Sequence, residues 1–411
     1  MIHMSTNKSN KPELRFKGFS DDWEQRKAVD IADYSKGNGY SKSDLTENGT
    51  PIILYGRLYT KYQFAIDEVD TFATPKDGSI YSQGNEVIIP ASGETAEDIA
   101  RASAVEKSGI LLGGDLNILR PFNFINPLFL ALTISNGEPQ KELAKKAQGK
   151  SIVHIHNSDI QEVTVSFPTR AEQDRIVAVF RSLDNLITLH QRKYEKLQII
   201  KKSMLENCFP KNGEKVPKIR FSGFTGDWEQ RKLAELVTRY EDPVETPHDG
   251  YIRLGIRSHA KGTFHEYVEP GHELETAQMH RVAANKLIFN ITFAWEHAVA
   301  ITTEDDAGKL VSHRFPQFSL SELLRPEFLK YVILDEGFHH KLYLASPGGA
   351  GRNRVLKVDE ALDYPIFFPS VEEQHKIGEF LNQLNDLITL HHRKLNRTQI
   401  CINRSFLYGS F

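Results

Sequence analysis

The chain contains the same pair of sequence blocks twice, and this repeat constrains its fold more than any other feature. Residues 12–28 (PELRFKGFSDDWEQRKA) and 217–233 (PKIRFSGFTGDWEQRKL) are identical at 11 of 17 positions, 205 residues apart. Residues 183–193 (LDNLITLHQRK) and 384–394 (LNDLITLHHRK) are identical at 8 of 11 positions, 201 residues apart. Between these blocks, residues 35–165 and 240–365 show no similarity that can be aligned. The pattern predicts one frame built twice around two unlike segments.

Each copy of the second block belongs to a predicted long helix. Both helices begin after a proline with a hydroxyl residue and a glutamate, Thr169 with Glu172 and Ser370 with Glu373, which is typical of a capping box. Apolar residues then recur at alternating spacings of four and three, as in the seam of a coiled coil. The helix over 170–207 would be about 55 Å long. The predicted seam consists of Ile176, Phe180, Leu183, Ile187 and Leu197, and of Ile377, Leu381, Leu384, Ile388 and Leu395.

The two helices are predicted to pack against each other as an antiparallel pair. Periodicity does not give this orientation, but a pseudo-twofold axis between two equivalent repeats does; the alternative is one separate core helix per domain. His190 and His391 fall in the seam without further metal-binding residues at ligand spacing, so we expect buried, hydrogen-bonded side chains there. More apolar residues flank the seam, which indicates a further partner for the helices: Val179, Leu186, Leu189, Phe380, Leu387 and Leu390.

Both segments between the blocks have a mixed α/β pattern. Strand-like runs in the first segment are 51–54, 86–90, 151–155 and 162–167, and in the second 251–254, 286–292, 298–303 and 364–368. Helical patterns cover 126–136, 138–148, 272–284 and 325–345. Frequent Gly, Pro, Asn and Asp residues between these runs predict short strands joined by exposed loops.

Composition limits the protein class. A chain of 411 residues is long enough for two or more domains, and 40% hydrophobic with 26% charged residues is typical of a globular protein. No apolar run approaches the roughly 20 residues of a membrane helix, and the polar N-terminus lacks the apolar core of a secretory signal. The two cysteines, Cys208 and Cys401, have no Cys or His at metal-ligand spacing, so neither a disulfide framework nor a metal site is expected. We expect a cytoplasmic protein.

The formal net charge of −3 means that binding to a polyanion requires local groups of basic residues. Arginine suits guanine, asparagine suits adenine, and lysine contacts phosphate. Serine and threonine in an amide-rich turn can also meet a phosphate. The candidate contacts are Arg57, Lys61, Ser92, Thr95, Lys145, Lys146 and Lys150 in the first segment, and Arg253, Arg257, His259, Lys261, Arg352, Asn353 and Arg354 in the second. For any single residue, a solvated surface position is the alternative.

Motifs for catalysis are missing. The sequence contains no phosphate-binding Gly-x-x-x-x-Gly-Lys-Ser/Thr loop, no Gly-x-Gly-x-x-Gly, no His-Glu-x-x-His and no Gly-x-Ser-x-Gly. The Asp/Asn-Pro-Pro-Tyr/Phe motif of amino-methyltransferases is also absent. A gene duplication that keeps catalysis would keep the site, so a repeated frame with two dissimilar segments favours recognition over catalysis.

The arrangement resembles the DNA-specificity (S) subunit of type I restriction–modification systems. The resemblance covers the chain from about Pro12 onward. It rests on the doubled Arg-Phe-x-Gly-Phe-x-x-Asp-Trp-Glu-Gln-Arg-Lys block at Arg15–Lys27 and Arg220–Lys232. It also rests on the doubled Phe-Pro-x-x-x-Glu-Gln helix start at Phe167–Gln173 and Phe368–Gln374.

The resemblance implies an α+β fold with a pseudo-twofold internal repeat, in which two mixed α/β target-recognition domains are joined by two long antiparallel helices that form a coiled coil. The expected parts are a disordered N-terminus (1–11), a first recognition domain (12–168), a central helix (169–209), a linker (210–216), a second recognition domain (217–369) and a C-terminal helix (370–411). Each domain would read one half of a split, asymmetric double-stranded DNA target, and the helices would set the gap between the halves.

The resemblance also implies partners. Two modification (methyltransferase) subunits would dock on the helices and restriction (motor–nuclease) subunits would join them. S-adenosylmethionine, ATP and Mg²⁺ would then be bound by those partners, and this chain would bind no cofactor, metal or membrane and perform no catalysis itself. Two other classes remain open from the residues alone: a two-lobed adaptor that binds protein or glycan, and a stand-alone nuclease or methyltransferase acting on DNA.

Overall fold

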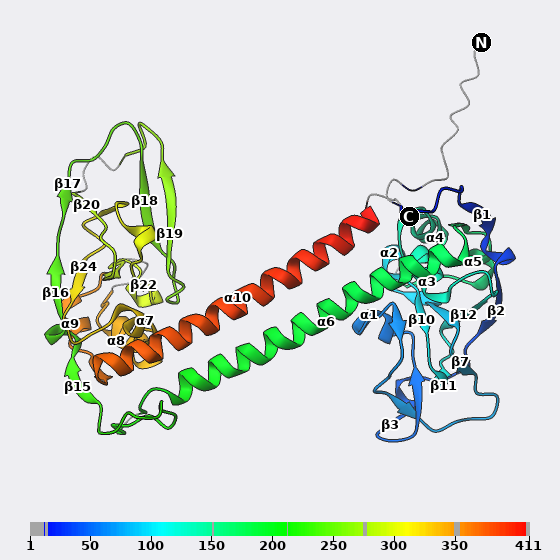
Figure 1. Ribbon diagram of the computed structural model, residues 1–411, viewed down its shortest axis with the longest axis horizontal. Coiled ribbons are helices and arrows are strands. Elements are labelled where there is room, and N and C mark those ends of the chain that lie inside the picture. Colours follow the sequence, from blue (N-terminus) through cyan, green and yellow to red (C-terminus); the bar gives the residue numbers. More distant parts are fainter. Residues whose placement is uncertain are drawn as a thin grey trace, which may run out of the picture. The chain divides into compact units, whose positions relative to one another are not determined.

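The computed structural model describes residue 12 and residues 15–149, 152–211, 213–273, 278–348 and 354–407, with the backbone alone for 401–407. The expected disordered N-terminus, residues 1–11, therefore lies outside the described residues. Contacts divide the chain into two compact units, one containing the residues up to Gln191 and from Arg393 onward, the other Arg192–His392. Each unit holds one α/β domain and parts of two long helices (Figure 1).

The first domain contains two five-stranded sheets, ordered β2-β12-β8-β10-β5 and β3-β6-β4-β11-β7. Strand β8 lies inside the first sheet and is buried along its whole length. The strands are β2 (Ala32–Lys36), β3 (Leu45–Thr46), β4 (Thr50–Ile53), β5 (Ala65–Ile66), β6 (Phe72–Ala73), β7 (Tyr81–Gln83), β8 (Glu86–Pro90), β10 (Ser103–Val105), β11 (Ser108–Leu112) and β12 (Leu116–Pro121), with a short pair β9 (Ser92–Gly93) and β13 (Val153–His154). The helices are α1 (Arg57–Thr60), α2 (Ala96–Ile99), α3 (Pro127–Ile134), α4 (Gly137–Lys146) and α5 (Asn157–Gln161).

The second domain contains a four-stranded sheet, ordered β16-β24-β21-β22, and a five-stranded sheet, ordered β17-β20-β23-β18-β19. The strands are β16 (Val237–Tyr240), β17 (Pro243–Val244), β18 (Tyr251–Ile256), β19 (Thr263–Val268), β20 (Met279–Arg281), β21 (Lys286–Phe289), β22 (Val299–Ile301), β23 (Leu310–Ser312) and β24 (Gln317–Leu320). The α-helices are α7 (Pro326–Val332), α8 (Glu336–Leu344) and α9 (Val358–Leu362), and a short 3-10 helix, η4, spans Ala294–Glu296.

The two domains share one topology although their sequences do not align. The order β2-β12-β8-β10 matches β16-β24-β21-β22, and β6-β4-β11-β7 matches β19-β18-β23-β20. In both second sheets the central pair is parallel, β4 with β11 and β18 with β23. The added strands differ: β3 extends the sheet beside β6, β17 extends it beside β20, and β5 and the β9–β13 pair have no counterpart among the described residues. The expected internal repeat therefore extends to the topology of the two segments, and their difference lies in the side chains.

The helix pair α3–α4 also has its counterpart in α7–α8. Asn126-Pro-Leu-Phe-Leu opens the first pair and Arg325-Pro-Glu-Phe-Leu opens the second. The proline stands at the first helical turn in both, where a missing N–H costs no hydrogen bond. The phenylalanines of the two segments, Phe129 and Phe328, are buried in the cores of their domains. Three shared positions in five are too few to recognise without the structure.

The first repeated block closes each domain onto its own end. β1 (Glu24–Lys27) pairs with β14 (Thr164–Phe167), and β15 (Glu229–Lys232) pairs with β25 (Pro365–Phe368), both antiparallel and in the same register. The tryptophan before each of these first strands is buried against a core phenylalanine, Trp23 5.8 Å from Phe129 and Trp228 5.8 Å from Phe328 between ring centroids. The start and end of each domain are thus joined.

A buried ion pair links each first block to the long helix that follows its domain. Arg15 donates from Nε and Nη2 to the two carboxylate oxygens of Glu172, both at 2.8 Å. Arg220 binds Glu373 in the same way, at 2.7 and 2.8 Å. The glutamates are 1% exposed. The expected capping box is wrong in this respect: these glutamates bind the distant arginines, not the backbone of the helix start.

The glutamine after each glutamate fastens the same helix start to the domain. Gln173 accepts from Asn126 N–H and donates to Phe124 O and Pro168 O. Its counterpart, Gln374, makes the equivalent three bonds, to Arg325 N–H, Leu323 O and Pro369 O. The glutamate and the glutamine of the repeated Phe-Pro-x-x-x-Glu-Gln motif therefore both have hydrogen-bond partners within the domain.

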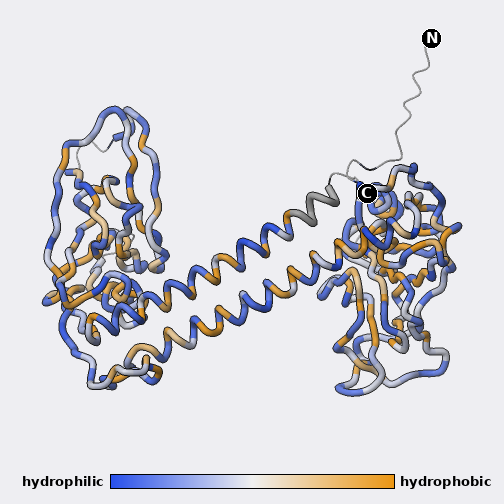
Figure 2. Tube along the Cα trace, viewed as in Figure 1, coloured by the Kyte–Doolittle hydropathy of each residue, from blue (hydrophilic) through white to orange (hydrophobic). Residues whose placement is uncertain are grey.

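The long helices are α6 (Arg170–Asn207) and α10 (Val371–Leu407). Within the second unit they are antiparallel neighbours: the rings of Tyr194 and His392 lie 5.4 Å apart, while Met204 packs against the core that contains Ile377. All predicted seam residues are buried or half-buried, as are His190 and His391. Figure 2 shows apolar residues recurring along both helices. The two predicted long helices are confirmed, while Ile176 and Phe180 pack in the core of the first domain and Ile377 and Leu381 in that of the second, so the seam itself stays a prediction.

Most predicted elements are present. All eight strand-like runs contain a strand, and α3, α4, α7 and α8 lie where helical patterns were found. The helix predicted over 272–284 is wrong, because the described part of this range contains strand β20. Met279 is fully buried there between β17 and β23, so pairing with neighbouring strands overrides the local helical pattern.

We expect replacement of either buried glutamate to destabilise the protein. Glu172→Gln or Glu373→Gln leaves a partly buried arginine without its carboxylate, and breaking a buried pair costs roughly 3–5 kcal/mol. The arginines keep 14% and 15% side-chain exposure, so we expect the lower end of this range. Urea unfolding followed by tryptophan fluorescence measures the loss. The exposed Glu24–Arg26 pair is the control, because Glu24→Gln should cost less than about 1 kcal/mol; equal losses would contradict the assignment.

Candidate nucleic-acid interface

Matching hydrogen bonds align the two domains residue by residue. Ile155 N–H donates to Ala91 O in the first domain, at 3.1 Å, and Leu356 N–H donates to Ile291 O in the second, at 2.8 Å. The segment after Ala91 is therefore equivalent to the segment after Ile291. In this alignment the predicted contacts Ser92 and Thr95 of the first domain are equivalent to Thr292 and Trp295 of the second.

Arg57 and Lys61 bind one carboxylate. Arg57 lies at the start of α1 with a side chain that is 9% exposed, and it donates to Asp70 Oδ1 at 2.6 Å and to Gln63 Oε1 at 2.9 Å. Lys61 Nζ donates to Asp70 Oδ2 at 2.7 Å. The bonds from Lys61 and Arg57 lower the pKa of Asp70 to about 2. The structure thus brings the two cations together and neutralises Arg57 within the domain.

Ser92 and Thr95 both lie just before α2, in β9 and at the N-cap of the helix. Ser92 Oγ lies 3.1 Å from His154 Nδ1, and Ser92 O accepts from Tyr59 OH. Thr95 is the N-cap of α2, and its hydroxyl oxygen accepts from Asp98 N–H at 3.1 Å. Both side chains already take part in local hydrogen bonds.

The predicted lysine face lies at the end of α4. Lys146 binds Glu162, while Lys145 is exposed and has no charged partner among the described residues. Lys150 lies outside the described residues. Lys145 is equivalent to Leu344 of α8, because the fully buried Leu143 and Leu342 precede them by two residues in the matched helices.

The predicted basic residues of the second domain follow the β18–β19 hairpin. Arg253 binds Glu266 across the two strands at 2.7 Å. Arg257 donates to Thr263 O and lies over the ring of Phe264 at 5.2 Å. The first two cations of the hairpin are therefore held by its other strand.

The hairpin turn carries His259 and Lys261, both exposed. His259 and Ala260 have φ angles of 61° and 49°, in the left-handed region. Their backbone N–H groups donate to Glu296 O and His297 O, each at 2.8 Å. The turn is thereby fixed to the end of η4, and Lys261 has no carboxylate partner among the described residues.

Arg352 and Asn353 lie outside the described residues, but Arg354 is described. Its guanidinium lies against two aromatic rings, Trp295 of η4 and Tyr343 of α8. Because η4 also anchors the hairpin turn, the structure brings Arg354, His259 and Lys261 to one end of the second domain.

Sequence reasoning missed three residues at this end: Trp295, Tyr343 and Arg314. Arg314 is exposed, has no carboxylate partner in the described part of the chain, and joins η4's segment through a bond from Ile291 N–H to its carbonyl. These positions can be recognised as candidate contacts only because Ile291 of the second domain is equivalent to Ala91 of the first. That equivalence depends on hydrogen bonds between residues far apart in sequence, so no local pattern signals it.

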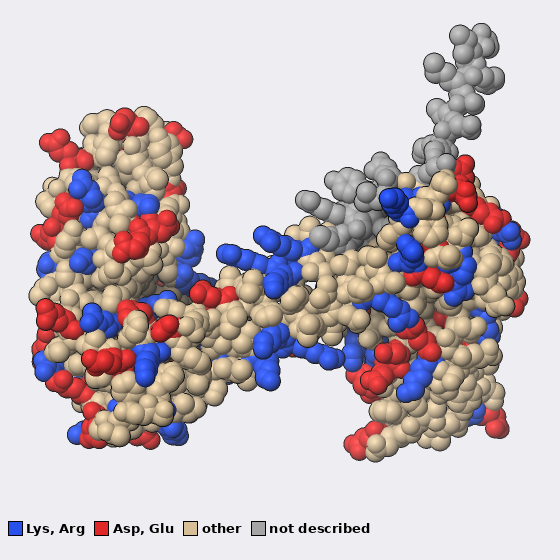
Figure 3. Space-filling model, in the orientation of Figure 1, with Lys and Arg blue, Asp and Glu red and all other residues tan. Residues whose placement is uncertain are grey.

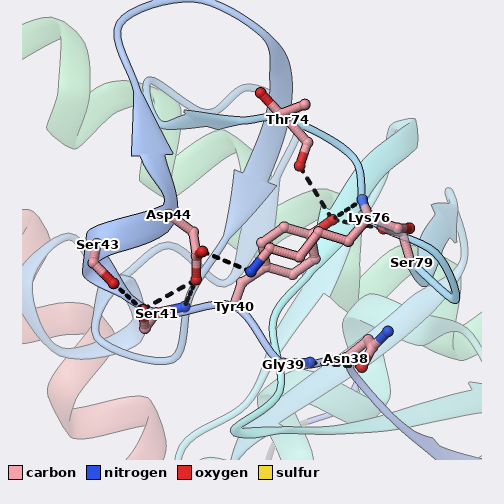
Figure 4. Close-up of polar contacts among 9 residues, drawn as sticks. All are labelled: Asn38, Gly39, Tyr40, Ser41, Ser43, Asp44, Thr74, Lys76 and Ser79. Carbon is pink, nitrogen blue, oxygen red and sulfur yellow. Dashed lines mark hydrogen bonds and ion pairs between the residues drawn. The ribbon is translucent and has the colours of Figure 1, made fainter.

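Charge elsewhere is mixed. On the face drawn in Figure 3, acidic and basic side chains are interspersed over both domains. A second polar cluster in the first domain is likewise self-contained (Figure 4): Lys76 Nζ donates to Asp44 at 2.6 Å, and Tyr40 OH accepts from Lys76 N–H. The bond from Lys76, with those from Ser41, lowers the pKa of Asp44 to about 2.

The second domain also has a hollow of about 510 Å³ beside β17, β18, β20 and β23. Its cations have partners in the protein, since Arg281 lies 3.6 Å from Asp242 and Lys309 donates to Asp305 O. Among the described residues, no cluster of three His, Cys, Asp or Glu side chains could hold a metal ion. In the same part of the chain, no helix is long and apolar enough to cross a membrane.

Comparison with known proteins agrees with this architecture. Residues 20–198 match the family described as type I restriction modification DNA specificity domain. The crystal structure of the type I restriction–modification S subunit from M. genitalium is similar over 98% of this chain and 99% of that one, with a TM-score of 0.58 and 12% identity. The HsdS subunit from Thermoanaerobacter tengcongensis matches 93% of this chain and 96% of its own, with a TM-score of 0.44 and 12% identity. No curated protein matches the chain by sequence.

Two α/β domains of one topology, each continuing into a long helix of a shared coiled coil, define the fold of a type I specificity subunit. Residues 20–198 match the model of the type I restriction–modification DNA-specificity domain, and nearly the whole chain has the fold of an S subunit.

The carboxylate that joins Arg57 and Lys61 should titrate far below its ordinary range. Asp70 has a pKa of about 2 against an ordinary 3.8, so its contribution to stability is complete above about pH 4 and is lost as the pH falls through 2. Lys61→Met should raise this pKa toward 3.8, measured from the carboxyl carbon by NMR. Lys76→Met is the matched control, because it should raise the pKa of Asp44 and leave that of Asp70 unchanged. An Asp70 that titrates near 3.8 in the unaltered chain would refute the pairing.

Proposed function

We propose that this chain is the non-catalytic recognition and assembly subunit of a type I restriction–modification complex, and that its two domains each read one half of a bipartite, asymmetric double-stranded DNA target. One observation carries the proposal: two domains of the same topology, each tied to its helix by the same Arg–Glu pair, have different side chains at equivalent exposed positions. Equal frames with different surfaces suit two different sequences read at equivalent places.

The functional parts are those expected from the resemblance: recognition domains at 12–168 and 217–369, helices at 169–209 and 370–411, and a linker at 210–216. Lys145, His259, Lys261 and Arg354 are the best candidates for DNA contact, because no carboxylate among the described residues neutralises them. A good bidentate contact to a base discriminates by about 1–3 kcal/mol, so several contacts in two half-sites suffice for specific binding.

The helices are proposed to dock two copies of one modification subunit. Their second repeated block has a seam face and an exposed face, and identical residues occupy both. Leu186 and Leu189 are 45% and 61% exposed, and their counterparts Leu387 and Leu390 are each 44% exposed. An internal seam needs no leucine at these positions. Identical exposed apolar residues in both copies favour one partner that binds twice.

The remaining activities belong to partners in this proposal. The modification subunits would use S-adenosylmethionine to methylate adenine, and restriction subunits would use ATP and Mg²⁺. All of these act on DNA in the cytoplasm. This chain would supply the target sequence and the arrangement of the subunits.

Lengthening the coiled coil should widen the target's spacer. One heptad inserted in α6 between Leu189 and Lys202, and one after Leu390 in α10, keeps the seam in register and adds about 10 Å, or roughly three base pairs. Methylated adenines mapped across host DNA, with and without this gene, identify the target. We expect both half-sites unchanged and a longer gap. Insertions of three residues are the control, since they break the seam; changed half-sites with a fixed gap would disprove the proposal.

Exposed leucines on the helices should matter for assembly and not for folding. Leu186→Asp with Leu387→Asp should change the chain's stability by less than about 0.5 kcal/mol each, because both positions are exposed. Co-purification with the modification subunit should nevertheless fail. Phe180→Asp, at a position that is 4% exposed, is the contrast and should lower the melting temperature of the chain itself. Normal co-purification of the double variant would argue against docking at this face.

A further inference from the structure

Arg354 lies over two aromatic rings, those of Tyr343 and Trp295. Its guanidinium carbon lies 4.4 Å from the ring centroid of Tyr343 and 5.6 Å from that of Trp295. Nη2 also donates to Tyr343 OH at 3.2 Å. A guanidinium stacked in this way keeps its plane, and four of its five N–H donors have no partner among the described residues.

Gly348 forms a third side of this clamp. A Cβ at this position would stand 2.5 Å from Arg354 Cγ, closer than carbon atoms can approach. The backbone at Gly348 therefore packs directly on the arginine side chain, and any other residue there would displace Arg354.

Two stacked histidines lie next to Trp295 in the fold, and His339 Nε2 is 3.4 Å from Trp295 O. The rings of His297 and His339 lie 4.5 Å apart and are parallel within 4°. His297 is 6% exposed, its Nε2 lies 2.7 Å from Ile333 O, and its burial lowers its pKa, so it is a neutral donor to that carbonyl. The same residue accepts from Ala260 N–H, which fixes the hairpin turn with Lys261 to this base. The clamp is thus built on a rigid part of the domain.

Comparison with Arg57 shows why Arg354 is assigned to recognition and Arg57 to the structure of its domain. Arg57 is also bound on several sides, but Asp70 neutralises it and its side chain is 9% exposed. Arg354 has no carboxylate partner in the described part of the chain. At the equivalent place the first domain has Val153, which is buried, so the shared frame does not need an arginine here.

Exposed apolar residues adjoin the members of this site in the sequence: Leu344 follows Tyr343, Val355 follows Arg354, and Phe293 precedes Trp295 by two residues. Phe293, Leu344 and Val355 are 44%, 60% and 50% exposed. Leu344 stands where the first domain has Lys145. An ordered planar cation suits the N7 and O6 acceptors of guanine, and the exposed apolar rim suits the methyl group of a thymine in a neighbouring base pair.

We propose that Arg354, clamped by Trp295, Tyr343 and Gly348, is a specificity-determining residue of the second domain and reads one guanine of its half-site through the major groove. The proposal rests on the proposed function of this chain as a DNA-recognition subunit. A guanidinium fork held in one plane matches the two acceptors of guanine, N7 and O6, and stacking reduces the entropy that the arginine loses on binding. Lys261, exposed on the adjoining turn, contacts the phosphate backbone.

The test uses the full complex with its modification subunits and maps methylated adenines for each variant. Arg354→Lys keeps the charge and loses the fork. We expect it to lower discrimination at one guanine position by on the order of tenfold, with the spacer and the other half-site unchanged. Gly348→Ala, which displaces the arginine without removing it, should weaken discrimination at the same position. Lys261→Ala is the matched control: it should weaken binding to all sequences alike and reduce the salt dependence of binding by about one phosphate contact.

Three results would overturn the proposal. The first is an unchanged target in a folded Arg354→Lys complex. The second is a change in the half-site that responds to substitutions in the first domain. The third is a lower melting temperature with an unaltered target, which would make the clamp purely structural. If the unaltered complex methylated no defined bipartite sequence, the proposed function itself would fail, and this outcome is separate from the other three.

Discussion

The buried pairing of an arginine with a glutamate is the interaction on which the rest of the architecture depends. Arg15 with Glu172, and Arg220 with Glu373, join the segment before each domain to the helix after it. The neighbouring glutamines bind the α3 and α7 helix starts to the same place. A charge buried without its partner costs several kcal/mol, so neither block can change alone. This physical coupling explains why the first repeated block and the Phe-Pro-x-x-x-Glu-Gln motif recur together at the two ends of each domain.

Between these fixed ends, the fold tolerates almost complete replacement of side chains. The matched strands keep their order and orientation because backbone hydrogen bonds and burial require only apolar residues at alternate positions. Exposed positions carry no such requirement. Lys145 stands where the second domain has Leu344, and Thr95 stands where it has Trp295. A recognition surface can change there without cost to the core, as a protein with two different half-targets requires.

The long helices divide their surface between two tasks. Ile176, Phe180 and Leu197 are buried, while Leu186 and Leu189 of the same helix remain exposed. Packing within the protein explains why the buried residues are apolar. It does not explain the exposed leucines. These leucines recur unchanged in α10, which ties them to the proposed partner rather than to the two domains.

The sequence by itself determined the repeat, both long helices and the resemblance to type I specificity subunits, because heptad spacing and strongly repeated blocks can be read directly along the chain. It also located eight strands, although the apparent helix over 272–284 became strand β20 through pairing with its neighbours. Only the tertiary structure decided that the two dissimilar segments share one topology, that Arg57 is neutralised by Asp70, and that Trp295 and Tyr343 enclose Arg354. These facts depend on residues far apart in the chain, and a single sequence carries no direct record of such distances.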